Sequence, residues 1–475
     1  MKNNHVAIIL AAGQGKRLKP LTNNIPKCLL KVGNKRIIEH IIDACNEAGI
    51  KDIIVVIGYK GEKVKRLLGS KVRYIWNRKY ETTQTMYSLW LARKVAAGRP
   101  IVHINGDTYF HPLILKKLLD HPYPDAMGVD FDVKLDKEAT KVFVQGNKVR
   151  DIGKDIPLDI ASGECLGIRK YSARTTSRFF ETLGKSVRKG QTAKYIFDII
   201  NECFKTQRFD AVSTDKLPWT EIDFEKDLKR ARKMDSMPIA LIFAAGVGRR
   251  IWPLTSDMPK ALLRIGRETL IEHQIGNLEK AGIRDILVIV GHRKNAVKKI
   301  LGNRVRYAEN PIYKTTQTMY SLWQTKKLAQ NKASIIIMGD LFFDKKLLTR
   351  LLKSKKKDCA VIDFESGLAA EVTKAKVVDG KVLRVGTSIP VSESVGEYLG
   401  LNKLSKKGTN KLFNICEKII DDNINWKKTH IPFNIFVAMR PLYAVSAKGT
   451  VWAEIDLKKD FYNAKKIYRK LRSNQ

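Results

Sequence analysis

The amino-acid sequence predicts an α/β protein of two tandem, doubly wound, Rossmann-like domains, each with a mostly parallel sheet. The first observation is a repeat. TTQTMYSLW stands at 82–90 and again at 315–323, and this separation (315 − 82 = 233) aligns the two halves without a gap. The second observation is that strand-like and helix-like segments alternate within each copy. The third is the length of 475 residues, because single cores stop growing near roughly 250–300 residues. We expect one domain at 1–235 and another at 236–475.

The elements of the first copy follow in order from its apolar patterns. Short apolar runs predict buried strands, and apolar residues at helical spacing predict amphipathic helices. The expected strands are 6–10, 52–58, 72–76 and 100–105, and the expected helices are 36–50, 62–68 and 83–96. Such alternation is typical of a parallel sheet with helices on both faces. Ligands of these sheets bind beyond the carboxyl ends of the strands, so functional residues should follow strands.

Composition and cysteine usage narrow the class of protein. Hydrophobic residues make up 44% of the chain, which is enough for two cores. No apolar run approaches the roughly 20 residues that a membrane span requires. The apolar N-terminal run leads into a glycine turn and does not read as a signal peptide. Six scattered cysteines without a CxxC pair exclude a zinc cluster of ordinary spacing. We expect a cytoplasmic protein without a membrane span.

The net charge of +40 allows two interpretations. A strongly basic chain can bind nucleic acid or an anionic membrane surface. Alternatively, lysines cover solvated faces and help to attract anionic phosphorylated substrates. No helix-turn-helix, RNP or zinc-finger pattern occurs, and the 88 Lys and Arg residues are spread over both repeats. We favour the second interpretation and expect no specific nucleic-acid partner.

A glycine-rich segment follows the first strand of each copy. It reads LAAGQGKRLKPLTNNIPK at 10–27 and FAAGVGRRIWPLTSDMPK at 243–260. Glycines let the backbone approach a phosphate closely, and the amides can cradle it. The candidate nucleotide-binding residues are Ala12, Gly13, Gly15, Ala245, Gly246 and Gly248, and the candidate catalytic cations are Arg17, Lys27, Arg250 and Lys260. The segment is neither the Rossmann G-x-G-x-x-G nor a P-loop. A lone G-x-G favours an ordinary glycine turn, but the long pattern is present twice.

Paired aspartates indicate a divalent cation site. Asp107 and Asp340 follow apolar strands, in INGDTYF and IMGDLFF. Either residue alone is equally consistent with a helix N-cap. A second pair, Asp223 and Asp456, ends the Trp-x-Glu-x-Asp motifs of WTEIDFEKD and WAEIDLKKD. Carboxylates from two distant segments predict an Mg²⁺ clamp in each copy.

A third shared motif is Gly-Glu-x-Leu-Gly, which contains Glu164 and Glu397. These carboxylates either contact an acceptor or are buried structural groups, and both interpretations stay open at this point.

Nearly the whole of each repeat resembles the nucleoside-triphosphate-transferase fold of sugar-phosphate nucleotidylyltransferases. The G-x-G-x-R…P-K pattern is common to that superfamily. The WTEID tail, the GExLG box and the segment from Asn77 to Leu89 resemble the narrower group of phosphocholine and aminoethylphosphonate cytidylyltransferases. The resemblance implies that Arg17 and Lys27 handle the triphosphate and that the aspartates bind Mg²⁺. It also places Gln84 and Gln317, within the repeated TTQTMYSLW, beside the nucleotide, with the polar face of that helix lining the site.

The implied reaction is transfer of a nucleotidyl group, CMP from CTP being favoured, to a small phosphorylated or phosphonate acceptor. The alternatives are a sugar-1-phosphate nucleotidylyltransferase and a repeat that binds nucleotide without turnover. Lys154, which the resemblance places at acceptor phosphate, is matched by Thr387, and Trp76 is matched by Glu309. We therefore expect both repeats to bind Mg²⁺-nucleotide and only the first to keep the usual acceptor preference.

Overall fold

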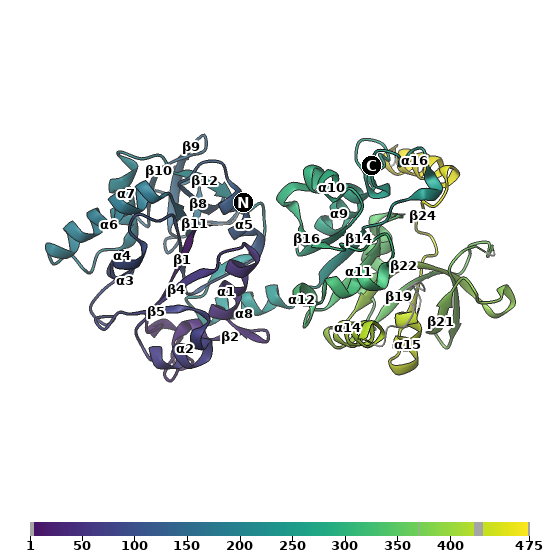
Figure 1. The fold of residues 1–475 in the computed structure, drawn as a ribbon, viewed down its shortest axis with the longest axis horizontal. Coiled ribbons are helices and arrows are strands. Elements are labelled where there is room, and N and C mark those ends of the chain that lie inside the picture. Colours follow the sequence, from purple (N-terminus) through teal and green to yellow (C-terminus); the bar gives the residue numbers. More distant parts are fainter. Residues whose placement is uncertain (1–3, 370, 422–430, 474–475) are drawn as a thin grey trace. The chain divides into compact units, whose positions relative to one another are not determined.

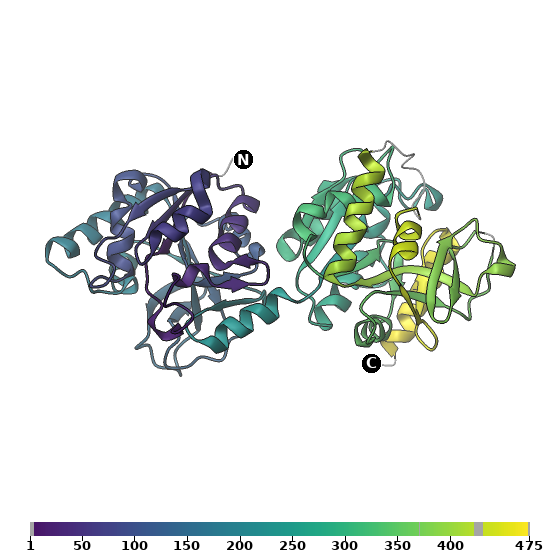
Figure 2. The same ribbon diagram turned by 90° about the horizontal axis from the view of Figure 1, so that it is seen from below.

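A computed structural model of the chain describes residues 4–369, 371–421 and 431–473. Its contacts divide the chain into two compact units, Met1–Asp235 and Ser236–Gln475, which we call unit 1 and unit 2 (Figure 1). Each unit has its own nine-stranded sheet with helices on both faces (Figure 1 and, from below, Figure 2).

The sheet of unit 1 is parallel in its first four strands. In spatial order these are β5 (Arg73–Trp76), β4 (Asp52–Ile57), β1 (Val6–Ala11) and β6 (Ile101–Asn105). Beyond β6 the sheet is mixed. The remaining strands, in order, are β11 (Gly163–Tyr171), β8 (Ala126–Asp130), β12 (Asp210–Ser213), β10 (Lys148–Gly153) and β9 (Lys141–Gln145). β11 is antiparallel to both β6 and β8, whereas β12 and β8 are parallel. The predicted α/β class is confirmed, with parallel pairing concentrated around the central strand β1.

Alternate residues of β1 enter different cores, which shows that the sheet is covered on both faces. Ala7 and Ile9 pack in one core with α1 (Ile37–Glu47), α2 (Gly61–Leu68), α5 (Pro112–Asp120) and α8 (Glu225–Asp235). Val6 and Ile8 pack in the other with α3 (Thr85–Leu91), α6 (Ala173–Arg188) and α7 (Ile196–Phe204). Period-two alternation of a continuously apolar strand is what a doubly wound sheet requires.

Unit 2 repeats this architecture with the same strand order. Its sheet runs β16 (Arg306–Glu309), β15 (Ile286–Val290), β14 (Ile239–Ala244), β17 (Ser334–Met338), β22 (Gly396–Leu404), β19 (Cys359–Asp363), β23 (Tyr443–Ser446), β21 (Lys381–Gly386) and β20 (Lys374–Val378). The helices include α9 (Leu270–Lys280), α10 (Lys294–Leu301), α11 (Thr318–Gln324), α13 (Lys345–Lys353), α14 (Lys406–Asp421), α15 (Ile431–Met439) and α16 (Lys458–Ser473). Figure 2 shows α14, in yellow-green, along the sheet, where its apolar face packs on Leu241 of β14 and Ile336 of β17.

A short two-stranded ribbon in each unit brings distant segments together. β7 (Thr108–Phe110) pairs with β13 (Trp219–Glu221), and β18 (Leu341–Phe343) pairs with β24 (Trp452–Glu454). The ribbon follows directly after Asp107 or Asp340, and the amide of Ile222 donates to the carbonyl of Asp107 at 3.0 Å. It therefore fixes the second aspartate of each unit beside the first.

The helix predicted at 83–96 is shorter than expected. α3 begins at Thr85 and ends at Leu91, and a separate turn, α4 (Arg93–Ala96), follows. Asn77, which is buried, donates from Nδ2 to Thr83 Oγ1 at 3.1 Å and to Ser88 Oγ at 3.0 Å. The matched Asn310 makes the same two contacts, with Thr316 and Ser321, at 3.0 Å each. Two retained polar positions of the repeated segment thus belong to a buried hydrogen-bond network.

No helix among the described residues combines the length and the apolar character that crossing a bilayer would require.

Candidate active site

The glycine loop leaves its backbone amides available at the carboxyl end of β1. Gly15 adopts φ +64°, a conformation that favours glycine, and its carbonyl accepts from Thr22 Oγ1 at 2.8 Å. In the described part of the chain, the amides of Gly13, Gln14 and Gly15 donate to no other residue. The space beside Gly13 is open, because a Cβ built there meets no atom within 4 Å. Free amides beside open space are what a cradle for an anionic phosphate requires.

The loop of unit 2 has the same construction. Gly248 has φ +68°, its carbonyl accepts from Thr255 Oγ1 at 2.8 Å, and Gly246 also has open space beside it. Ala12 and Ala245 are buried beneath the two loops, and their carbonyls accept from the amides of Tyr59 and His292. These two alanines therefore position the loop, and each of their carbonyls already accepts a hydrogen bond from the protein backbone.

A buried lysine joins the two aspartates of each unit. Lys27 Nζ lies 2.8 Å from Asp107 Oδ2 and 2.6 Å from Asp223 Oδ1. Lys260 Nζ lies 3.0 Å from Asp340 Oδ2 and 2.8 Å from Asp456 Oδ1. Burial disfavours the charged ammonium, but the two carboxylates outweigh burial and raise the pKa of Lys27 above its ordinary value. The structure thus brings together the predicted catalytic lysine and both predicted metal ligands.

A third carboxylate belongs to this cluster and was not among the predicted site residues. Burial raises the pKa of Glu221 to about 8, and the charges of Asp107 and Asp223 reinforce the shift. Glu454, its counterpart, behaves in the same way: burial and then Asp340 and Asp456 raise its pKa to about 8. The signal was present in the sequence, because the Trp-x-Glu-x-Asp alternation places this Glu on the same side as the final Asp.

The carboxylate cluster fits a divalent cation. In unit 2, one oxygen from each of Asp340, Glu454 and Asp456 lies within 4.8 Å of the others. Asp107 Oδ1 and Asp340 Oδ1 are buried and accept no hydrogen bond from any residue that the structure describes. A buried carboxylate oxygen without a donor is costly unless a cation occupies its lone pairs. Three carboxylates are a donor set suited to Mg²⁺, which prefers oxygen ligands.

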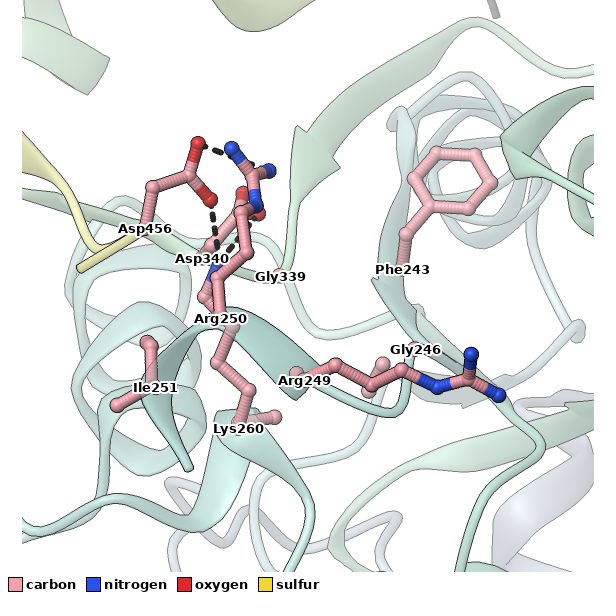
Figure 3. Close-up of a pocket in the computed structure, with 12 residues that line it drawn as sticks. Phe243, Gly246, Arg249, Arg250, Ile251, Lys260, Gly339, Asp340 and Asp456 are labelled. Atoms are coloured by element: carbon pink, nitrogen blue, oxygen red, sulfur yellow. Dashed lines mark hydrogen bonds and ion pairs between the residues drawn. The ribbon is translucent and has the colours of Figure 1, made fainter. Parts of the chain in front are cut away.

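An arginine closes the open side of each cluster. Arg17 Nη1 lies 3.3 Å from Asp223 Oδ2, and Arg250 Nη2 lies 3.1 Å from Asp456 Oδ2, with both arginines exposed. Figure 3 shows Arg250, Lys260, Asp340 and Asp456 converging, whereas Arg249 points away from them. A cavity of about 270 Å³ is lined by the four converging residues together with Gly246 and Gly248. Glycine loop, cations and carboxylates therefore share one pocket in unit 2.

Lys154 extends the charge network of unit 1 toward solvent. Its Nζ lies 3.2 Å from Glu138 Oε2, and Glu138 lies 3.9 Å from Arg17 Nη1. Burial would raise the pKa of Asp223, but Lys27, Arg17 and Lys154 together lower it. The structure therefore places Lys154 within electrostatic reach of the carboxylates.

Glu164 and Glu397 lie at the edge of the same clusters, on β11 and β22. Burial raises the pKa of Glu164 to about 7, and the neighbouring Asp136 and Asp130 add to the shift. Burial also raises the pKa of Glu397, which is 7% exposed. Their charges in turn contribute to the raised pKa values of Glu221 and Glu454. Both glutamates are thus close to the centre, and contact with an acceptor stays a prediction.

Comparison with known proteins decides the family. The model of the nucleotidyl transferase family matches residues 6–141 and 239–371, so the two matches together cover more than half of the chain. The chain belongs to the nucleotidyl transferase family. It is therefore an enzyme of a class that acts on a nucleoside triphosphate and a phosphorylated acceptor, and it carries the family's domain twice.

Several relatives of this nucleotidyl transferase have names that state an activity. It is 32% identical over 197 residues to choline-phosphate cytidylyltransferase of Streptococcus pneumoniae, covering 40% of this chain and 81% of that protein. It is 28% identical over 247 residues to CTP:phosphoglutamine cytidylyltransferase of Campylobacter jejuni, covering 47% of this chain and 97% of that protein. The bifunctional protein GlmU of Thermoanaerobacter pseudethanolicus is 46% identical over 198 residues, covering 41% of this chain and 38% of that protein.

Among solved structures, the CTP:phosphocholine cytidylyltransferase of Streptococcus pneumoniae matches with a TM-score of 0.41 and 27% identity. The match covers 49% of this nucleotidyl transferase and 99% of the other chain.

The two units of the nucleotidyl transferase differ beyond β4 and β5. In unit 1, Trp76 lines a cavity of about 360 Å³ together with Glu62 and Tyr80. In unit 2, Glu309 replaces Trp76 and lies 2.7 Å from Lys294 and 2.5 Å from Lys298. The carboxylate of Glu309 is therefore already neutralised by the protein itself.

The remaining predicted residues lie outside the charge cluster. Gln84 and Gln317 are exposed N-caps of α3 and α11, and the amide of Gln84 donates to the carbonyl of Thr192 at 3.1 Å. Neither side chain hydrogen-bonds the glycine loop in the described structure, so a contact with the nucleobase stays a prediction. Thr387, which matches Lys154, is exposed.

Proposed function

We propose that this nucleotidyltransferase transfers CMP from CTP to a small phosphorylated or phosphonate acceptor and releases pyrophosphate. The observation that carries the proposal is the centre of one buried lysine between two aspartates beside an open glycine loop, formed in both units. The preference for CTP rests on two relatives named as cytidylyltransferases.

The roles of the residues follow from where charge must be balanced. The amides of Gly13 to Gly15 and the side chain of Arg17 would hold the triphosphate. An acceptor oxygen attacks the α-phosphorus, its new P–O bond replaces the bond to the bridging oxygen, and pyrophosphate leaves with that oxygen. Lys27 lies where it can neutralise negative charge as the phosphates rearrange. Such transfer depends on alignment and charge neutralisation and needs no protein nucleophile.

Mg²⁺ is part of the proposal. Asp107 and Asp223, with Glu221 beside them, would hold it in unit 1, and Asp340, Glu454 and Asp456 would hold it in unit 2. When bound, the cation supplies Lewis-acid stabilisation of the phosphate oxygens. Lys154 would face the acceptor phosphate in unit 1, and Thr387 removes that cation from unit 2.

A second candidate function is sugar-1-phosphate nucleotidylyl transfer. It is favoured by the 46% identity to part of GlmU, and by a relative named as a bifunctional sugar-1-phosphate nucleotidylyltransferase/acetyltransferase from Sulfurisphaera tokodaii, 28% identical over 220 residues. A third possibility, that one unit binds nucleotide without turnover, is weakened by the retention of the lysine and both aspartates in each unit.

A pyrophosphate-release assay tests the choice between these functions. The full chain is incubated with Mg²⁺, each of the four nucleoside triphosphates and, in turn, phosphocholine, phosphoethanolamine, aminoethylphosphonate and several sugar 1-phosphates. We expect release with CTP and an amine-bearing phosphate or phosphonate. Release only with UTP or dTTP and a sugar 1-phosphate would replace the proposal by the second candidate.

A further inference from the structure

Unit 2 has a second cavity whose lining is strongly basic. The cavity has a volume of about 650 Å³ and is lined by Lys345, Lys346, Thr349, Arg350, Lys353, Ser354 and Val445. It shares no lining residue with the Lys260 pocket. Its size lies within the range of about 300–1,000 Å³ that is typical of small-molecule sites.

Three of the four cations that line this cavity form one stripe of α13. Lys346, Arg350 and Lys353 are spaced by four and three residues, so their side chains share one helix face, and all three are exposed. Arg350 is held at the rim because its Nη1 donates to the carbonyls of Ser446 at 2.8 Å and Lys448 at 2.6 Å.

Nothing acidic in the described structure neutralises this stripe. No ion pair is formed by Lys345, Lys346, Arg350 or Lys353 with any described residue. The acids that flank α13 are buried and already engaged: Asp344 accepts from the amide of Leu347 at 2.9 Å, and Asp358 pairs with Arg440 at 2.6 Å. Like charges held together on one face repel each other, so a protein gains by binding an anion there.

Unit 1 provides an internal comparison, because the same helix is neutral there. In α5, Lys116 pairs with Asp120 at 2.8 Å and Lys117 pairs with Asp215. At the matched positions of unit 2, 233 residues on, Asp120 becomes Lys353 and Asp215 becomes Lys448, while Pro112 and Leu113 become Lys345 and Lys346. Lys448 pairs with Glu365 at 2.8 Å, so four cations have no acidic partner within the described ranges of the chain.

The charge reversal is therefore local and specific to unit 2, and it goes beyond the general basicity of the chain. We propose that this cavity is a second anion site, which binds a ligand that carries two or more phosphate charges. Lysine and arginine both bind phosphate oxygens through charge-assisted hydrogen bonds. The phosphate belongs either to a free metabolite or to a lipid headgroup.

The test introduces into unit 2 the two aspartates that unit 1 carries at the matched positions. The full chain, the variant Lys353→Asp/Lys448→Asp and the control Lys299→Asp/Lys418→Asp are titrated with tripolyphosphate by calorimetry. The control changes net charge equally at two exposed lysines that do not line the cavity. Both active sites are the same in all three proteins, so a difference in stoichiometry reports the second site. We expect the wild type and the control to bind one equivalent more than the Asp variant, or to bind it at least about tenfold more tightly.

Equal binding by all three proteins, or equal losses in the variant and the control, would overturn the proposal. If circular dichroism shows that the Asp variant is unfolded, Lys345→Gln/Lys346→Gln/Lys353→Gln removes the charge without adding acids and takes its place. Flotation with phosphatidylcholine vesicles, with and without phosphatidic acid, separates the two sources of phosphate. Variant-sensitive binding to the acidic vesicles identifies a headgroup, and variant-sensitive binding to tripolyphosphate alone identifies a free metabolite.

Discussion

At the residue scale, the centre of each unit is one buried cation held by two carboxylates. Lys27 is hydrogen-bonded to both Asp107 and Asp223, so each charge depends on the others for its stability in a partly buried site. Breaking such a set by removing one partner leaves an uncompensated charge. The same three residues recur in unit 2 with similar distances. Sequence reasoning could name these residues, because Lys27 ends a repeated glycine-rich motif and the two aspartates follow strands within repeated motifs. It could not show that Lys27 bridges the aspartates, because the three come from segments far apart in the chain.

Removal of Lys27 or Asp107 should depress turnover by unit 1. In a Lys260→Ala background, which silences unit 2, we expect Lys27→Ala and Asp107→Ala each to lower kcat by about a hundredfold or more, as is usual when a preorganised charge contact is lost. Pyrophosphate release is the measurement, and Lys51→Ala, at an exposed lysine that forms no ion pair with the described residues, is the control. Unfolding of the variants, seen by circular dichroism, would instead assign these residues a structural role.

The two buried glutamates should make stability depend on pH. The pKa of Glu221 and that of Glu454 are raised to about 8 from an ordinary 4.5, so the folded state binds these protons more tightly than the unfolded state. Their contribution is fully present below about pH 4.5 and is lost as pH rises toward 8. The free energy of unfolding is measured by urea titration in the absence of metal. Between about pH 5 and pH 8, it should therefore fall less for the variant Glu221→Gln/Glu454→Gln than for the wild type. Parallel curves for both proteins would contradict this assignment.

At the element scale, local patterns predicted most of what positions the site. Continuous apolar runs predicted β1, β4, β5 and β6, and helical spacing predicted α1 and α2. The ribbon of β7 and β13 and the mixed half of the sheet were not predicted, because pairing between distant strands leaves no local pattern. The break after Leu91 was also missed, since Ala92 and the residues around it are good helix formers. The polar residues of TTQTMYSLW suggested a surface that faces the site. Two of them, Thr83 and Ser88, accept hydrogen bonds from the buried Asn77 and so have a structural role.

That network should contribute to stability in each unit. Asn77→Ala removes the donor to Thr83 and Ser88 and the acceptor of the Lys79 amide, and it leaves buried groups unpaired. We expect a loss of about 1–3 kcal/mol in the unfolding free energy of unit 1, with Asn310→Ala acting in the same way on unit 2. Thermal unfolding of the full chain is the measurement, and Asn147→Ala at an exposed turn is the control. A change for Asn77→Ala no larger than that of the control would refute this role.

At the scale of the whole molecule, the two units share the residues proposed to bind nucleotide and differ at other positions. The glycine loops, lysines and aspartates match, whereas Lys154, Trp76 and the acids around α5 are replaced in unit 2. Sequence alignment of the halves showed the first two replacements. It could not show that Glu309 is neutralised by Lys294 and Lys298, because that depends on side chains from α10. Family membership was predictable from motifs, whereas the acceptor was not, because fold does not fix substrate.

The net charge of +40 should not support specific recognition of nucleic acid. Diffuse contacts with phosphates give binding that is independent of sequence and falls steeply with salt. We expect fluorescence anisotropy with duplex DNA to show weak binding that disappears near physiological ionic strength. Submicromolar binding that persists at about 200 mM salt would show a nucleic-acid function instead.

We expect the chain to carry two nucleotidyl-transfer centres with different acceptor sites. The most direct measurement is Mg²⁺-dependent pyrophosphate release from CTP by the wild type, Lys27→Ala, Lys260→Ala and the double variant, each with the same acceptor panel. Loss of the Lys154 cation would weaken every phosphate acceptor of unit 2 by about ten- to a hundredfold in affinity. Replacement of Trp76 by Glu309 changes the side chain offered to the rest of the acceptor, so the two single variants should rank the acceptors differently. We expect divergent profiles for the single variants and, for the double variant, release lowered about a hundredfold or more with every acceptor. Identical profiles with similar turnover, or release by the double variant at a rate near that of the wild type, would contradict this expectation.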